Sequence, residues 1–145
     1  MRVVSAPAEG RCLCGAVRVR AALAREISAC HCEMCRRWSG GILMGIEAPV
    51  ASVEVEGPVA RYRSSGFAER AWCRDCGSAL WLRNVEGEGS DVYELVPGLF
   101  EEAGGARLSR EVYADRCPAG YALAGDHARV TAADYAARNR TVEGP

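Results

Sequence analysis

Three tight groups of cysteines constrain what this chain can fold into more than any other feature. The 145 residues contain eight cysteines, and most of them fall into the patterns C-x-C, C-x-C-x-x-C and C-x-x-C. These groups are Cys12 and Cys14; Cys30, Cys32 and Cys35; and Cys73 and Cys76. Such spacing lets several sulfur atoms converge on one point, as metal sites and redox centres require. A disulfide framework is the alternative, but it is typical of shorter secreted chains.

The ligand type and the spacing favour zinc. Sets of thiolates bind zinc or iron–sulfur clusters, and the spacings here match neither common ferredoxin pattern. Because Cys117 stands far from the groups, we divide the cysteines into four, three and one. The first and last groups then close a tetrahedral site, as structural zinc sites do, and the middle group leaves an open fourth position, as catalytic sites do. The spacing does not force this division, which is only the simplest one.

Length, charge and hydropathy exclude several classes of protein. The length predicts one domain, residues 1–145. The net charge of −1 provides no strong field for nucleic acid or acidic membranes. No apolar run approaches the roughly 18 residues of a membrane span, and the first residues lack the apolar core of a signal peptide. We therefore expect a cytoplasmic protein with neither nucleic acid nor membrane among its partners.

Short alternating segments predict a mainly β protein with the cysteines at strand ends and turns. A short helical turn is expected at residues 33–38, and a C-terminal helix at 131–138 with Thr131 as its N-cap. Strands are expected at residues 13–20, 26–32, 42–46, 53–56, 59–63, 67–72, 79–83, 91–96 and 110–115.

The cysteine motifs resemble those of a known family. Residues 10–15 read GRCLCG, residues 30–36 read CHCEMCR, and residues 72–78 read WCRDCGS. This pattern is similar to the glutathione-dependent formaldehyde-activating enzyme family, also described as S-hydroxymethylglutathione synthase-like. The resemblance implies a β-tent fold of small antiparallel sheets with zinc-binding knuckles, to which the sequence pattern adds a short C-terminal helix.

The resemblance also implies the metal ligands and the activity. It implies two zinc ions per chain, one structural and one expected to be catalytic. The structural ion would be bound by Cys12, Cys14, Cys73 and Cys76, and the second by Cys30, Cys32 and Cys35. The implied reaction is that of a carbon–sulfur lyase acting on the adduct of formaldehyde with glutathione or another small thiol.

Two other functions remain open on the sequence alone. A non-catalytic, zinc-stabilised binding module of the same fold would keep the four-cysteine site, but it would not need the open group at residues 30–35. A methionine sulfoxide reductase of type B would need Cys117 as its nucleophile. The sequence around Cys117 and the C-x-C groups do not fit that class, and a small buried residue is the simpler interpretation of Cys117.

Three further residues lie beside the open group. Arg36 and Arg37 follow it and are predicted to bind an anionic thiol such as glutathione, since guanidinium groups suit carboxylates. The alternative is that both are solvated surface residues. His31 stands between two expected ligands and could be a fourth ligand or a general base. Because neighbouring side chains on an extended segment point to opposite faces, we favour a position outside the ligand set.

Overall fold

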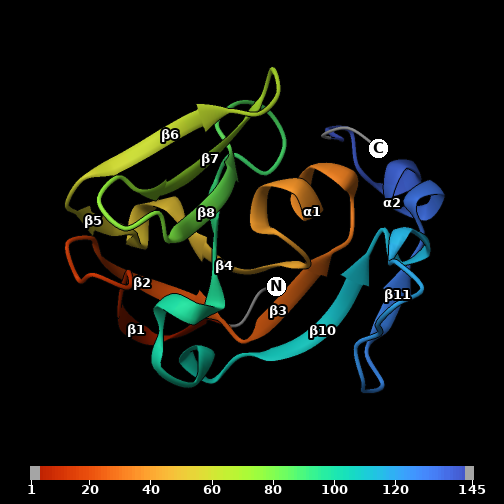
Figure 1. Ribbon diagram of the computed structural model, residues 1–145, viewed down its shortest axis with the longest axis horizontal. Helices are drawn as coiled ribbons and strands as arrows, with labels where there is room; N and C mark the ends of the chain where they lie inside the picture. The colour runs from red at the N-terminus through yellow and green to blue at the C-terminus, as the bar shows by residue number, and fades with distance from the viewer. Residues whose placement is uncertain (1–3, 143–145) are drawn as a thin grey trace.

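The protein, described here by a computed structural model over residues 4–142, consists of two β-sheets and two short α-helices (Figure 1). The smaller sheet has three antiparallel strands in the order β1-β2-β5. These strands are β1 (Val4–Arg11), β2 (Arg18–Ala24) and β5 (Glu54–Glu56). The prediction of a mainly β fold is confirmed.

The larger sheet has eight strands in the order β11-β10-β3-β4-β9-β8-β7-β6. Its strands are β3 (Glu26–Cys30), β4 (Leu43–Pro49), β6 (Val59–Arg63), β7 (Ala68–Cys73), β8 (Ala79–Asn84), β9 (Val92–Leu95), β10 (Arg107–Val112) and β11 (Ala128–Val130). Most neighbours are antiparallel, but β10 runs parallel to both β3 and β11. The chain leaves β9 through two 3₁₀ turns, Pro97–Leu99 and Glu101–Gly105, before β10 runs along β3 in the parallel direction.

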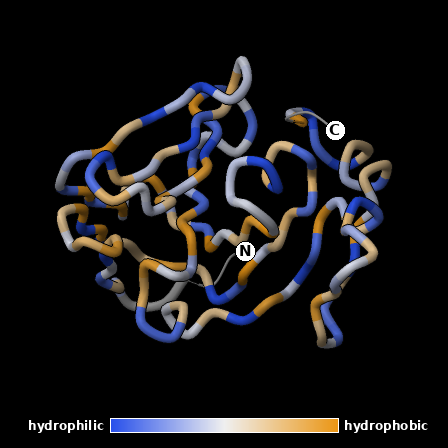
Figure 2. Tube along the Cα trace, viewed as in Figure 1, coloured by the Kyte–Doolittle hydropathy of each residue, from blue (hydrophilic) through white to orange (hydrophobic). Residues whose placement is uncertain are grey.

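The main core lies where the two sheets face each other. In β2, Val19, Ala21 and Leu23 are buried, whereas Arg18 and Arg20 are exposed, as the alternating sequence predicts. Trp81 of β8 is fully buried and meets the ring of Tyr93 edge-on at 5.1 Å between centroids. Hydrophobic and hydrophilic residues are interleaved along the strands rather than gathered in one segment (Figure 2), as expected for sheets with one buried face.

A second apolar cluster forms around helix α1 (Glu33–Ser39) and the C-terminal helix α2 (Ala132–Arg138). Tyr113 and Tyr135 meet there with ring centroids 5.4 Å apart. The predicted C-terminal helix is confirmed, and Thr131 caps it by accepting a hydrogen bond from the Asp134 amide at 3.1 Å. Asp115 accepts a second bond from the Ala132 amide at 2.8 Å, which ties α2 to the segment after β10.

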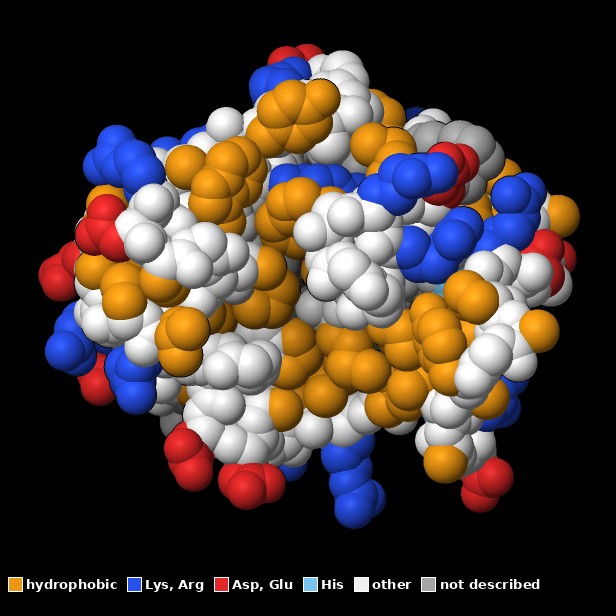
Figure 3. Space-filling model, in the orientation of Figure 1, with side chains coloured by type: hydrophobic (Ala, Val, Ile, Leu, Met, Phe, Trp, Pro, Cys, Tyr) orange, Lys and Arg blue, Asp and Glu red, His pale blue; other side chains and the backbone are white. Residues whose placement is uncertain are grey.

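Among the described residues, no helix has the length and hydrophobicity needed to cross a membrane. On the face shown in Figure 3, hydrophobic side chains form a band across the middle and charged side chains border it.

Candidate metal centres and the adjoining cavity

Four cysteines from two distant turns meet between the sheets. One pair follows β1 and the other lies in the turn between β7 and β8, and the four are Cys12, Cys14, Cys73 and Cys76. The two turns are joined directly, because the Leu13 amide donates to the Ser78 hydroxyl at 3.0 Å. Backbone amides also face the sulfurs: Val17 N–H donates to Cys12 Sγ at 3.3 Å, and Ala16 N–H donates to Cys14 Sγ at 3.5 Å.

The spacing of these sulfurs fits a tetrahedral zinc ion. All four ligand atoms lie within 4.8 Å of one another. The Sγ atoms of Cys12 and Cys14 are 3.6 Å apart, and those of Cys14 and Cys73 are 3.8 Å apart. A tetrahedron with zinc–sulfur bonds of about 2.3 Å has edges of about 3.8 Å. The four-cysteine group could therefore hold one metal ion without rearrangement.

The other three clustered cysteines form a separate group at the start of α1. Cys30 ends β3, Cys32 is the N-cap of α1, and Cys35 lies in its first turns. The Cys35 amide donates to Cys32 Sγ at 3.4 Å, so the helix itself orients one sulfur. The three sulfurs lie within 4.8 Å of one another, with Cys32 and Cys35 buried and Cys30 partly exposed. Three sulfurs leave the fourth position of a tetrahedral ion to another ligand.

Sulfur contacts distribute charge unevenly over this group. Hydrogen bonds from the Cys30 and Cys35 thiols, with a smaller contribution from the nearby charge of Arg70, lower the pKa of Cys32 to about 2. The pKa of Cys30 is raised, because its thiol is hydrogen-bonded to the same two sulfurs and is desolvated. These opposite shifts favour Cys32 over Cys30 as the first of the two thiols to ionise.

A cavity of about 480 Å³ opens beside the three cysteines. Cys30, Cys32 and Cys35 all line it. Charges of both signs share the remaining wall, which includes Arg70, Arg83, Arg110, Glu47, Glu88, Asp91 and Glu94. The C-terminal part of the chain closes one side with Tyr135, Asn139 and Thr141. A small polar molecule in this cavity would thus contact sulfur, cationic and anionic groups together.

A second hollow, of about 740 Å³, is lined mainly by apolar residues of β4 and the segment after β9. It contains neither the three-cysteine group nor a comparable set of charges. We therefore take the cavity at the three cysteines as the candidate functional site.

His31 points away from the cysteines and into a buried polar cluster. Its Nε2 lies 2.6 Å from Glu111 Oε1, and His127 and Arg129 both reach Glu111 Oε2. Burial alone would raise the pKa of Glu111, but hydrogen bonds from His127 and His31 outweigh it and lower that pKa. This cluster joins the loop that carries Cys30 and Cys32 to β10 and β11.

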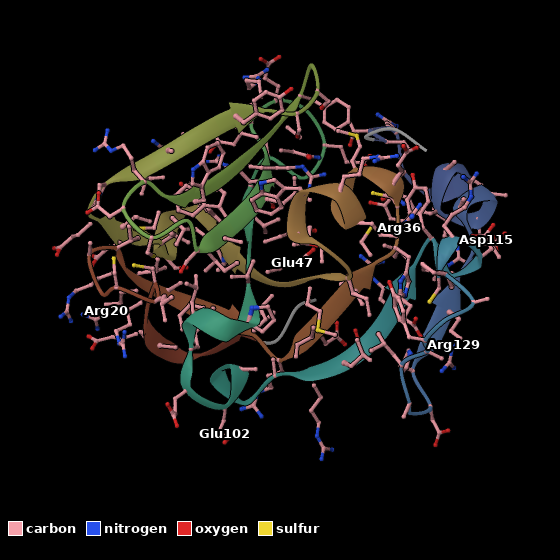
Figure 4. The ribbon with its side chains drawn as sticks, in the orientation of Figure 1. Arg20, Arg36, Glu47, Glu102, Asp115 and Arg129 are labelled. Atoms are coloured by element: carbon pink, nitrogen blue, oxygen red, sulfur yellow. The ribbon has the colours of Figure 1, made fainter. Side chains whose placement is uncertain are left out.

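The predicted residues beside the cysteines lie outside the cavity wall. Arg36 Nε donates to the His31 carbonyl at 2.9 Å, and Arg36 sits on α1 toward the C-terminal part of the molecule (Figure 4). Arg37 is 78% exposed in its side chain and pairs with Glu33 at 2.9 Å. Neither lines the cavity, although substrate binding by either stays a prediction. Cys117 belongs to neither sulfur group, and the expectation that it is a buried residue was wrong, because it is partly exposed in the turn after Arg116.

Sequence reasoning missed Arg70 and the Glu111 cluster. Both are charged residues at buried positions of strands, 2% and 3% exposed. In β7 the alternation places Arg70 on the same buried face as Ala68, so a charged residue at an inward position was the available signal. For Glu111 the sequence carries no local signal, because its partners His31 and His127 lie far away in the chain.

Comparisons with known proteins agree with this geometry. The family model described as glutathione-dependent formaldehyde-activating enzyme matches residues 7–116. A Schizosaccharomyces pombe protein named an uncharacterized lyase is 33% identical over 118 residues, which cover 80% of this chain and 85% of that protein. A crystal structure of a Rhodobacter sphaeroides protein matches with a TM-score of 0.55 and 23% identity, covering 70% of this chain and 99% of that one. The last similarity concerns the fold alone.

Proposed function

Because the chain belongs to the glutathione-dependent formaldehyde-activating enzyme family, we propose that it is a carbon–sulfur lyase acting on the adduct of formaldehyde with glutathione or another small thiol. The observation that carries this proposal is the cavity whose wall includes all three cysteines of the open group. A purely structural metal site would have no need of such a cavity.

The donor set fits zinc at both cysteine groups. The four-cysteine group would hold a structural ion, and Cys30, Cys32 and Cys35 would hold the second. A zinc ion bound at the second group would supply a position for the substrate's sulfur as a thiolate and a Lewis acid.

The rest of the cavity would bind and orient the thiol. Glutathione carries two carboxylates and one ammonium group, and the wall offers both matching charges. Guanidinium groups such as those of Arg83 and Arg110 suit carboxylates, and Glu88 and Asp91 suit an ammonium. Holding the sulfur and the aldehyde carbon in a reactive arrangement is the main contribution expected of such a site.

The reaction needs little further chemistry from the protein. In the cleavage direction the carbon–sulfur bond of the hydroxymethyl thioether breaks, and its electron pair stays on sulfur. The hydroxyl proton is lost as the carbonyl bond of formaldehyde forms and in the net reaction passes to the released sulfur, which gives one thiol and one formaldehyde; addition is the reverse. Tyr135 would remain a neutral hydrogen-bond donor to the oxygen, because burial raises the pKa of its hydroxyl to about 12.

The test is to follow adduct formation and cleavage from glutathione and labelled formaldehyde by NMR. We expect the zinc-loaded protein to accelerate exchange above the spontaneous rate, and Cys32→Ser to lose that acceleration. Cys117→Ser is the matched control, since Cys117 lies in neither sulfur group. Zinc retained at the four-cysteine group of Cys32→Ser would show that this variant is folded. A wild-type rate equal to the spontaneous rate would refute catalysis, and adduct binding without acceleration would favour the binding module.

A further inference from the structure

Arg70 of β7 places a buried positive charge against the three-cysteine group. Its side chain is 2% exposed, and both Nη1 and Nη2 lie 3.8 Å from Cys35 Sγ. The guanidinium carbon sits 5.2 Å from the centre of the Trp38 ring, which holds the group from α1. A charged side chain is almost never buried without a partner, because desolvation of the charge is costly.

The sulfur of Cys35 is one contact of this charge, and the charge balance of the sulfur group gives a reason for it. Three thiolates around a divalent cation leave one negative charge, and a guanidinium in contact with one of the sulfurs cancels it. The four-cysteine group differs, because Cys14 is exposed to water and backbone amides donate to its sulfurs. Both groups contain two buried cysteines, but none of the three at the cavity is as exposed as Cys14, so water screens their charge less and the need for a fixed positive charge is greater.

We propose that Arg70 is the counter-charge that allows the group of Cys30, Cys32 and Cys35 to retain a divalent metal ion such as zinc. Arg70 acts through Cys35 and not on a substrate, so it is a positioning residue for the metal centre. This inference rests on the proposal above that the three-cysteine group binds metal.

The geometry also separates arginine from lysine at this position. The two Nη atoms contact one sulfur as a fork while the flat face of the group lies over Trp38. A lysine keeps the charge but offers neither the fork nor the flat face. Lysine should therefore preserve part of the stabilisation of the bound metal, and an uncharged side chain of similar length should preserve none of it.

The experiment measures zinc per chain and zinc affinity, by competition with a chromogenic chelator, in the wild type and in Arg70→Met, Arg70→Lys and Arg83→Met. Arg83 is the matched control, because it lines the same cavity but stacks on Tyr93, 4.3 Å from the ring centre. We expect Arg70→Met to bind the second zinc roughly 10- to 100-fold more weakly, as is usual when a side chain supporting a metal ligand is removed. Arg70→Lys should lose less affinity for the second zinc, and Arg83→Met should bind it as tightly as the wild type does.

The four-cysteine group serves as an internal control for folding, since its zinc should keep wild-type affinity in every variant. The absorption bands of the cobalt-substituted protein give a second readout, in which the three-sulfur centre should change most in Arg70→Met, less in Arg70→Lys and not in Arg83→Met. Equal affinity in Arg70→Met and the wild type would overturn the inference and leave the metal site standing. Equal losses in Arg70→Lys and Arg70→Met would overturn it as well, because the charge would then not be the cause. A wild-type protein with one zinc would overturn the three-cysteine metal site and this inference with it.

Discussion

Replacing Gly57 with alanine should destabilise the protein far more than its position in a turn suggests. Gly57 follows β5 and has a φ of +111°, a region that side chains other than glycine rarely adopt. A Cβ atom added there would lie 2.1 Å from the Ala16 carbonyl oxygen and 2.9 Å from the Val17 Cα. Both obstacles are backbone, so no side-chain rotation can relieve them.

The expected cost has two parts. The positive φ costs about 1–3 kcal/mol for a residue with a Cβ. To relieve the contact, the backbone at Ala16 and Val17 must also move, and this segment donates amide hydrogen bonds to Cys14 and Cys12. Each hydrogen bond that weakens costs about 1 kcal/mol, so the total is about 3–5 kcal/mol.

Urea unfolding of zinc-loaded protein measures this cost, with two alanine variants as controls. Gly105 also has a positive φ, of +81°, but no atom lies within 4 Å of a Cβ added there. Gly105→Ala therefore measures the cost of the positive φ without the steric contact. Gly66→Ala has neither feature and should change stability little. We also expect Gly57→Ala to release zinc from the four-cysteine group at a lower chelator concentration than Gly105→Ala. A cost equal to that of Gly105→Ala would refute the reasoning.

Three further predictions concern the buried cluster and the two cysteine groups. The pKa of Glu111 is lowered in the folded state from 4.5, so its carboxylate stabilises the fold above about pH 4.5, and this contribution is lost as pH falls through the lowered pKa. Glu111→Gln should lower the free energy of unfolding by about 3 kcal/mol at pH 7. In urea unfolding, the difference in this free energy between the variant and the wild type should shrink in acid. The control Glu101→Gln, at an exposed position, should change the free energy of unfolding little at any pH. Removing the metal from the four-cysteine group opens a loop whose ends, Cys14 and Cys73, lie 59 positions apart. If the ion acts as a cross-link does, calorimetry should show that the free energy of unfolding falls by about 4 kcal/mol. Glutathione binding measured by titration calorimetry should be equal in the wild type and Arg37→Ala if the cavity is the binding site, and weaker in the variant if Arg37 contacts the ligand.

The local parts of the fold were predictable from the sequence, and the long-range pairings were not. The hairpin of β6 and β7 can be read within one segment, and the structure has it. The strand expected at residues 13–20 was placed too early, because residues 13–17 form a turn at the cysteines and β2 spans Arg18–Ala24. Strand β1 was missed because Pro7 interrupts its pattern, at the point where the register with β2 shifts. The parallel pairing of β10 with β3 depends on a return path that no short stretch of sequence encodes.

The candidate site divides in the same way. The cysteine groups could be identified because each is local and the chemistry of clustered thiols allows few alternatives. Arg70 escaped notice because its burial depends on the register of β7 against β8. The favoured interpretation of His31 as a residue outside the ligand set agrees with its contact to Glu111, but the identity of that partner was not encoded nearby.

The end of the chain gives this fold a way to evolve. All the clustered cysteines, and Arg70 with them, lie within residues 7–116, the stretch that matches the family. Tyr135, Asn139 and Thr141 line the same cavity from beyond that stretch. Substitutions there can reshape the cavity while every metal ligand stays in place. Part of the cavity wall is thus encoded outside the stretch that carries the clustered cysteines, and selection can change that part without replacing a cysteine.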